Sequence, residues 1–117
     1  MIDINNLKIY VLAKEIEIDI RSLTKKFPKE EKYCLTQQLN RAANSIGANI
    51  AEGAGRSTKP DFLRFLSQAS GSLKEIIHHL EIAKLEEYVS TGDFILVTIK
   101  VNELGRMINA FIKNTKK

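Results

Sequence analysis

Apolar residues recur along this chain at alternating steps of three and four residues, the spacing that lines one side of an α-helix. Four such stretches follow one another with short connections between them. No stretch alternates apolar and polar residues for long enough to propose a sheet. Because short connections make successive helices antiparallel neighbours, the pattern predicts an all-α protein. We expect an antiparallel up-down-up-down four-helix bundle that forms a single domain over residues 1–117.

The first predicted helix covers about residues 6–26, and its apolar stripe continues to Phe27 as the chain turns. Pro28 suits the first position of the next helical segment, because its missing N–H would have no partner there. The second helix stops within residues 52–55, where we expect a glycine to adopt the left-handed conformation of a C-cap. The core positions predicted for these two helices are Ile9, Leu12 or Ala13, Ile16, Ile20 and Leu23, and then Leu35, Leu39, Ala42, Ile46, Ile50 and Gly53.

The third predicted helix opens at residues 57–61, where Thr58 and Asp61 have the spacing of a capping box. A turn near residues 88–92 leads to the fourth helix, with Ser90 or Thr91 as its cap. The core positions predicted for these two helices are Phe62, Leu66, Ala69, Leu73, Ile76, Leu80 and Ala83, and then Phe94, Val97, Val101, Leu104, Ile108 and Phe111.

Other apolar residues lie outside these core stripes. Ile4, Val11 and Ile18 are seven residues apart and form a second stripe on the first helix, roughly 160° from the core stripe if each residue turns 100°. Single surface aliphatics are ordinary, but a second stripe indicates a face that meets another subunit. We therefore expect a homo-oligomer. Further aliphatic residues lie beside the core stripes of the third and fourth helices: Leu63, Ile77, Ile82, Leu85, Ile95, Ile99 and Ile112.

Three glycines fall inside predicted helices: Gly47, Gly71 and Gly105. A glycine there costs about 1 kcal/mol relative to alanine. We expect these positions to allow close contact between helix backbones.

The composition is that of a globular protein, with 44% apolar and 27% charged residues. No apolar run approaches the roughly 20 residues that cross a bilayer, and the N-terminus lacks the basic and apolar regions of a signal peptide. The single cysteine, Cys34, cannot form an internal disulfide. We therefore expect a cytoplasmic protein with no membrane partner.

The net charge is +4, and the excess lies near the C-terminus. From Thr98 onward the only acid is Glu103, against five basic residues: Lys100, Arg106, Lys113, Lys116 and Lys117. Such a stretch attracts polyanions, RNA and DNA among them. The alternative is a solvated helix end, whose cations suit the negative end of the helix dipole.

Few residues suggest catalysis or metal binding. A ferritin-like di-iron site needs a Glu-x-x-His pair on each of two helices, and only Glu75 with His78 fits. His79 points about 100° away from His78, so the two do not readily share one metal. Cys34 has no histidine near it in sequence. We therefore expect no enzyme activity, no metal site and no cofactor.

A polar stripe runs beside the apolar stripe of the second helix, and its members are Arg41, Ser45, Asn49 and Glu52. Half-buried polar groups need partners, so we expect a structural hydrogen-bond network, with Glu52 capping the glycine turn or pairing with Arg41 or Arg56. The functional alternative is a ligand or nucleic-acid contact through basic residues that follow: Arg56, Lys59 and Arg64.

Residues 38–53, QLNRAANSIGANIAEG, resemble the "RAA-SI-ANIAEG" signature of the four-helix-bundle proteins encoded in bacterial 23S rRNA intervening sequences. The likeness continues through Gly55-Arg56, Asp61-Phe62, Phe65-Leu66 and residues 69–75. It also covers residues 23–28 and 104–107, so it spans nearly the whole chain. Ser70 stands where that family's "ARGS" element has arginine, which weakens any binding role placed there.

The resemblance implies an antiparallel four-helix bundle, commonly assembled as a barrel-like homopentamer, with no catalytic residue or cofactor. The related accessory variability determinant proteins of diversity-generating retroelements bind nucleic acid and a reverse transcriptase. Our leading hypothesis is a non-enzymatic homo-oligomer, pentameric by resemblance, that binds rRNA or DNA through basic residues. The alternative is a scaffold or adaptor that binds a protein partner and has no affinity for nucleic acid.

Overall fold

The computed structural model describes residues 3–116, and every regular element within this range is helical. Four α-helices follow in chain order: α1 (Lys8–Thr24), α2 (Leu35–Ala54), α3 (Lys59–Leu85) and α4 (Thr91–Lys116). Two short 3-10 helices, η1 (Ile4–Asn6) and η2 (Lys29–Glu31), precede α1 and α2. The all-α, four-helix prediction is therefore confirmed.

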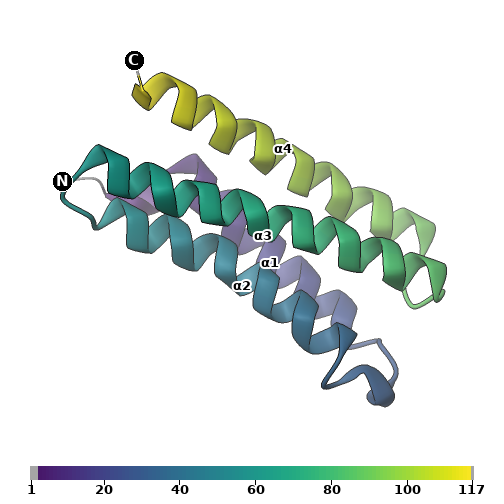
Figure 1. Ribbon diagram of the computed structural model, residues 1–117. Helices are drawn as coiled ribbons and strands as arrows, with labels where there is room; N and C mark the ends of the chain where they lie inside the picture. The colour runs from purple at the N-terminus through teal and green to yellow at the C-terminus, as the bar shows by residue number, and fades with distance from the viewer. Residues whose placement is uncertain (1–2, 117) are drawn as a thin grey trace.

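Successive helices run in opposite directions along an elongated bundle of 44 × 23 × 20 Å (Figure 1). Helix α2 packs against α1 and α3, and α4 packs against α3 and α1, so each helix has two neighbours. The contact between α2 and α3 is the most extensive of the four, and that between α1 and α4 the least. No helix in the described part of the chain is long and apolar enough to span a membrane.

The predicted apolar stripes form the core of the bundle. Every predicted core position of α2 and α3 is buried. In α1 the structure selects Ala13, which is fully buried, over the half-buried Leu12. Phe94 and Phe111 of α4 are only half-buried, because they lie where this helix begins and ends. The periodic pattern thus located the core and overestimated burial only at Phe94 and Phe111, the two ends of the stripe on α4.

The starts of α3 and α4 are capped by side-chain hydroxyls. Thr58 Oγ1 accepts a hydrogen bond from the Asp61 backbone N–H at 3.3 Å, as the capping-box spacing predicted. Ser90 Oγ accepts from the Asp93 N–H at 3.1 Å, so Ser90 rather than Thr91 caps α4. Pro28 does not begin α2. It precedes η2, and α2 begins seven residues later, at Leu35.

The predicted left-handed glycine at the end of α2 is wrong. Gly55 has a right-handed φ of −85°, and its N–H donates to the carbonyls of Ala51 and Glu52 as the last turn tightens. The left-handed residue is Glu87, with φ 64°, in the turn after α3. There the Tyr88 N–H donates to the Ala83 carbonyl at 2.9 Å, which closes a Schellman motif around a residue that is not glycine.

The closest glycine contact lies between α2 and α3. A Cβ at Gly53 would stand 2.8 Å from both Phe62 Cδ1 and Phe65 Cβ, so only glycine fits there without a shift. At Gly47 and Gly105 the nearest atoms would be at ordinary van der Waals distance. At Gly71 nothing lies within 4 Å, because this position faces outward from α3. The expectation of a close helix contact at Gly71 is therefore wrong within a single chain.

Candidate nucleic-acid and subunit interfaces

A small polar cluster joins α2 to α3 in the middle of their contact. Ser72 Oγ, which is buried, donates to Ser45 Oγ at 2.8 Å. Asn49 Nδ2 donates to Ser45 Oγ at 3.0 Å and to the Ser45 carbonyl at 2.8 Å. These bonds satisfy polar groups inside an apolar interface, so the cluster fixes the register of the two helices. Sequence reasoning missed Ser72, since nothing local connects it to Ser45.

The other two residues of the predicted network lie outside this cluster. Arg41 is exposed, and its Nη2 donates to Gln38 Oε1 at 2.9 Å on the same helix. Glu52 is also exposed and pairs with Arg56 at 2.6 Å, one of the pairings considered for it. The four residues share one side of α2 but divide into a half-buried pair and two exposed ones, so the structure does not join them in one network.

Two arginines at the turn between α2 and α3 stack on one aromatic ring. The guanidinium carbons of Arg56 and Arg64 lie 4.9 and 4.4 Å from the Phe65 ring centroid. Arg64 also lies 3.4 Å from an Asp61 carboxylate oxygen. Stacking on Phe65 and ion pairs with Glu52 and Asp61 hold the two arginine side chains in place. Each of these acids offsets part of the positive charge.

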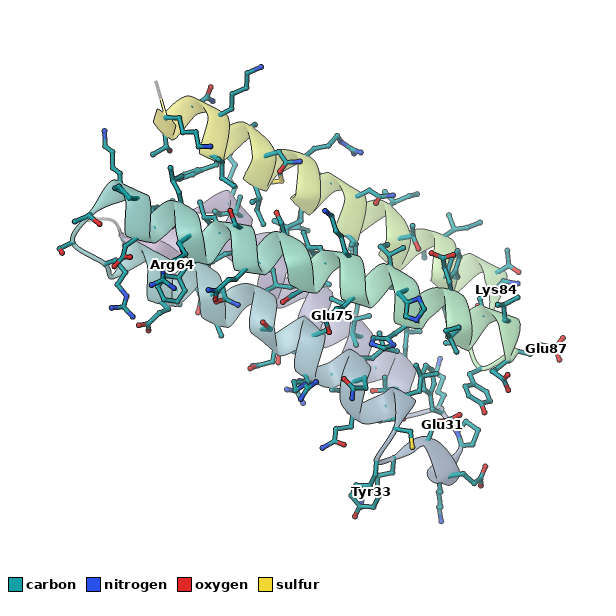
Figure 2. The ribbon with its side chains drawn as sticks, viewed as in Figure 1. Glu31, Tyr33, Arg64, Glu75, Lys84 and Glu87 are labelled. Carbon is teal, nitrogen blue, oxygen red and sulfur yellow. The ribbon has the colours of Figure 1, made fainter. Side chains whose placement is uncertain are left out.

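The start of α3 meets the end of α4. The rings of Phe62 and Phe111 lie 5.4 Å apart in an edge contact, which brings basic residues distant in sequence to one end of the bundle. Figure 1 shows the α2–α3 turn and the C-terminus at this end. Figure 2 places Arg64 there, opposite the end that holds Tyr33 and Glu87. We call this surface the basic end; its members are Arg56, Lys59, Arg64, Lys113 and Lys116.

Three residues of the basic end have no acidic partner among residues 3–116. Within residues 3–116, no carboxylate lies within 4.0 Å of the ammonium groups of Lys59, Lys113 or Lys116. Lys117, also predicted to contact nucleic acid, lies outside the described residues. The exposed lysines therefore carry the net positive charge of this end.

Lys100 and Arg106, two other predicted nucleic-acid contacts, lie elsewhere. Lys100 Nζ is 2.7 Å from Asp19 Oδ2 and 3.0 Å from Glu15 Oε1, so it joins α4 to α1. Hydrogen bonds to these two acids raise the pKa of Lys100 above its ordinary value of 10.5. Arg106 lines a groove between α3 and α4. The basic residues after Thr98 are therefore not one surface.

Exposed apolar side chains also occur on both α1 and α4. Val11 and Ile18 of α1 are 49% and 64% exposed, and Leu96 and Ile99 of α4 are 62% and 56% exposed. The two helices are neighbours, joined by Lys100. Leu96 was not singled out in the sequence, because its exposure depends on how α4 is turned against α1. Other exposed aliphatics lie near the turn between α3 and α4: Ile82, Leu85 and Ile95.

The candidate metal and nucleophilic residues do not converge. His78 is exposed, and its ring stacks edge-on with that of half-buried His79 at 5.3 Å. Burial and the neighbouring His78 lower the pKa of His79. No group of three or more His, Cys, Asp or Glu residues with metal-binding geometry occurs among residues 3–116. Cys34 is an exposed free thiol in the turn before α2.

The fold and these surfaces define a class of protein: a small antiparallel four-helix bundle with a basic end and exposed apolar side chains on α1 and α4. Residues 5–110 match the 23S rRNA-intervening sequence protein family, and the chain belongs to that family. The resemblance in its sequence is thereby confirmed.

A solved structure has the same fold. It is a crystal structure of a protein of unknown function from the S23 ribosomal protein family of Bacteroides thetaiotaomicron. The similarity covers 90% of this chain and 98% of that one, with a TM-score of 0.83 and 25% sequence identity. A comparison with curated proteins finds no match.

Proposed function

We propose that this protein is a non-enzymatic homo-oligomer, of five subunits as its family resemblance implies, that binds RNA or DNA through the basic end. The observation that carries the proposal is the position of Lys59, Lys113 and Lys116, which lie at one end of the bundle with no carboxylate in ion-pair range among residues 3–116. Assembly multiplies this effect, because several copies present their basic ends to one nucleic acid.

The expected mode of binding is contact with phosphates rather than reading of bases. At this end Phe62 and Phe111 contact each other edge to face, and half-buried Phe65 already carries the guanidinium groups of Arg56 and Arg64. Base stacking needs a free aromatic face, whereas flexible lysines suffice for phosphates. Binding therefore depends steeply on salt, with each phosphate contact contributing about −0.9 to the slope of log K against log salt for duplex DNA.

The apolar side chains on α1 and α4 support assembly. Val11, Ile18, Leu96 and Ile99 come from two neighbouring helices, each close to half exposed or more. Clusters of this kind mark sites of protein contact more often than single exposed aliphatics do. Burying them against another subunit removes apolar surface from water, which stabilises the assembly by about 25 cal/mol per Å² of buried apolar area.

The test combines light scattering with fluorescence anisotropy. Scattering gives the mass of the purified protein alone and with a 23S rRNA fragment, and anisotropy measures RNA and duplex DNA affinity from low to moderate salt. The double variant Lys113→Glu with Lys116→Glu should weaken binding at least about tenfold and flatten the salt dependence. The matched control, Lys29→Glu with Lys32→Glu, changes the net charge equally at the opposite end and should lose much less.

The competing candidate is a scaffold that binds a protein partner, for which the exposed apolar side chains are equally suitable. A stable assembly with no affinity for RNA or DNA at low salt would contradict the proposed nucleic-acid function and favour the scaffold. Equal losses in the two double variants would show that overall charge, rather than the basic end, attracts the polyanion.

A further inference from the structure

A groove lies between α3 and α4, on the flank of α4 that faces away from α1. It has a volume of about 340 Å³, and Leu73, Ile77 and Val101 give it an apolar lining. Lys74 and Arg106 line it as well, and neither has a carboxylate within 4.0 Å among residues 3–116. Ser70, Asn102 and Asn109 also line the groove, which thus combines apolar and polar side chains with two cations that form no ion pair within residues 3–116, and it suits a surface that combines aliphatic and acidic side chains.

Such a surface lies along the flank of α4 that meets α1, where Leu96 borders Asp19 and Ser22 of α1. Leu96, Ile99 and Glu103 are spaced i, i+3 and i+7, which places them on one side of the helix. Glu103 is exposed and forms no ion pair within residues 3–116. Val11 and Ile18 are exposed on α1, the helix that packs beside α4. We call Val11, Ile18, Leu96, Ile99 and Glu103 the α1–α4 surface.

We infer that the α1–α4 surface of one copy docks into the α3–α4 groove of the next copy, with Glu103 facing Lys74 and Arg106. The inference rests on the proposed oligomer and specifies which of its surfaces meet. Apolar burial provides the affinity, and the carboxylate opposite two cations fixes the register.

Charge argues against the two symmetric arrangements. A groove against a groove would bring Lys74 and Arg106 of both copies together, and the α1–α4 surface against itself would oppose two Glu103 carboxylates. Like charges in an interface disfavour docking. Contact between two different surfaces is heterologous, so every copy offers one of each, and the assembly closes into a ring when the rotation between copies allows it.

The docking also separates two groups of basic residues. Arg106 belongs to the contact between copies, whereas Lys113 and Lys116 lie two and three turns further along α4, at the basic end. The same helix thus joins subunits along its first and middle turns and presents its last turn to a polyanion.

The experiment uses two variants of the full chain, each altered on one surface. Ile18→Asp with Ile99→Asp disrupts the α1–α4 surface, and Lys74→Glu with Arg106→Glu disrupts the groove. All four positions are exposed, so circular dichroism should show unchanged helix content. By sedimentation velocity, each variant alone should be monomeric. Mixed in equal amounts they should form a one-to-one dimer and nothing larger, because only one intact pair of surfaces remains.

Other results overturn the inference in identifiable ways. If the groove variant assembles by itself to the wild-type size, the groove is not part of the contact. If the mixture stays monomeric, the two surfaces do not meet. If the wild-type protein is itself monomeric at high concentration, the proposed oligomer fails, and the inference fails with it.

A charge exchange provides a second measurement. Glu103→Lys should weaken assembly at least about tenfold, since it places a third cation in the contact. Adding Lys74→Glu and Arg106→Glu to that variant should restore the wild-type assembly. If the triple variant assembles no better than Glu103→Lys alone, Glu103 does not face Lys74 and Arg106 in the contact.

Discussion

The α2–α3 pair and helix α4 use their side chains differently. Every large aliphatic residue of α2 is buried, and its contact with α3 includes both the close approach at Gly53 and the Ser45–Ser72 hydrogen bond. Helix α4 leaves Ile95, Leu96 and Ile99 exposed, whereas α3 exposes large aliphatics only in its last turn, at Ile82 and Leu85. The difference indicates that α2 and α3 supply much of the stability of the single chain, whereas part of α4 remains available for contact with other molecules.

This comparison also changes how the family signature is understood. Residues 38–53 lie within α2, and most of their apolar and small members are buried by packing, Ala48 being exposed. The most distinctive segment of the sequence therefore maintains the fold, and the surfaces proposed for binding lie outside it.

The largest expected effect is a difference in the free energy of unfolding between two leucine-to-alanine variants. Leu66→Ala on α3 should lower the free energy of unfolding by roughly 2–5 kcal/mol, because Leu66 is fully buried and its removal leaves a cavity. Leu96→Ala on α4 should lower it by less than about 0.5 kcal/mol, because Leu96 is 62% exposed. Urea denaturation at low protein concentration measures both. Equal losses would show that α4 supports the single chain as much as α3 does.

Two glycines of the α2–α3 pair should respond in opposite directions. Gly53→Ala should lower the free energy of unfolding by about 1–3 kcal/mol, since the new Cβ would lie 2.8 Å from the side chains of Phe62 and Phe65. Gly71→Ala should raise it by about 1 kcal/mol, because alanine favours the helix and meets no atom within 4 Å. Thermal unfolding followed by circular dichroism gives the sign of each. Stabilisation by Gly53→Ala would contradict the close contact.

The turn from α3 to α4 offers a smaller effect. Glu87→Gly should raise the free energy of unfolding by about 1 kcal/mol, since glycine adopts the φ of 64° without the steric cost of a side chain. Glu86→Gly is the matched control. It removes the same charge from a residue with a right-handed φ of −80° and should be neutral or destabilising. A gain in both variants would trace the effect to charge rather than to backbone conformation.

The smallest effect concerns the ion pairs that join α4 to α1. Because hydrogen bonds to Asp19 and Glu15 raise the pKa of Lys100, the folded state holds this proton more tightly than the unfolded state. The stabilisation is complete below the ordinary pKa of 10.5 and is lost as the pH rises through the raised pKa. It should amount to no more than about 1 kcal/mol, since the pair is partly exposed.

Comparison with Lys100→Gln isolates that contribution. The pKa of Tyr88 is also raised, by its hydrogen bond to Glu31, but Tyr88 is present in both proteins. The difference in unfolding free energy between wild type and Lys100→Gln should therefore shrink between pH 9 and pH 12. A difference that stays constant over this range would show that Lys100 contributes through packing of its aliphatic chain.

The sequence by itself determined the four helices, the buried positions and the caps at Thr58 and near Ser90. These features depend on the spacing of apolar residues and on side chains that bond to backbone groups three residues away, so they can be read locally. The same local reading failed at Glu87, because nothing marks a glutamate as left-handed when glycine is the expected residue.

Only the tertiary structure decided which side chains from different helices meet. Periodicity gives the direction in which a residue points around its own helix. It does not give which neighbouring helix lies on that side, or the offset of the two helices along their axes. That information brought Ser72 to Ser45, placed Lys100 between two acids of α1, and left Leu96 exposed. It also divided the basic residues of α4 between a groove and the basic end, since helix packing rather than spacing sets their neighbours.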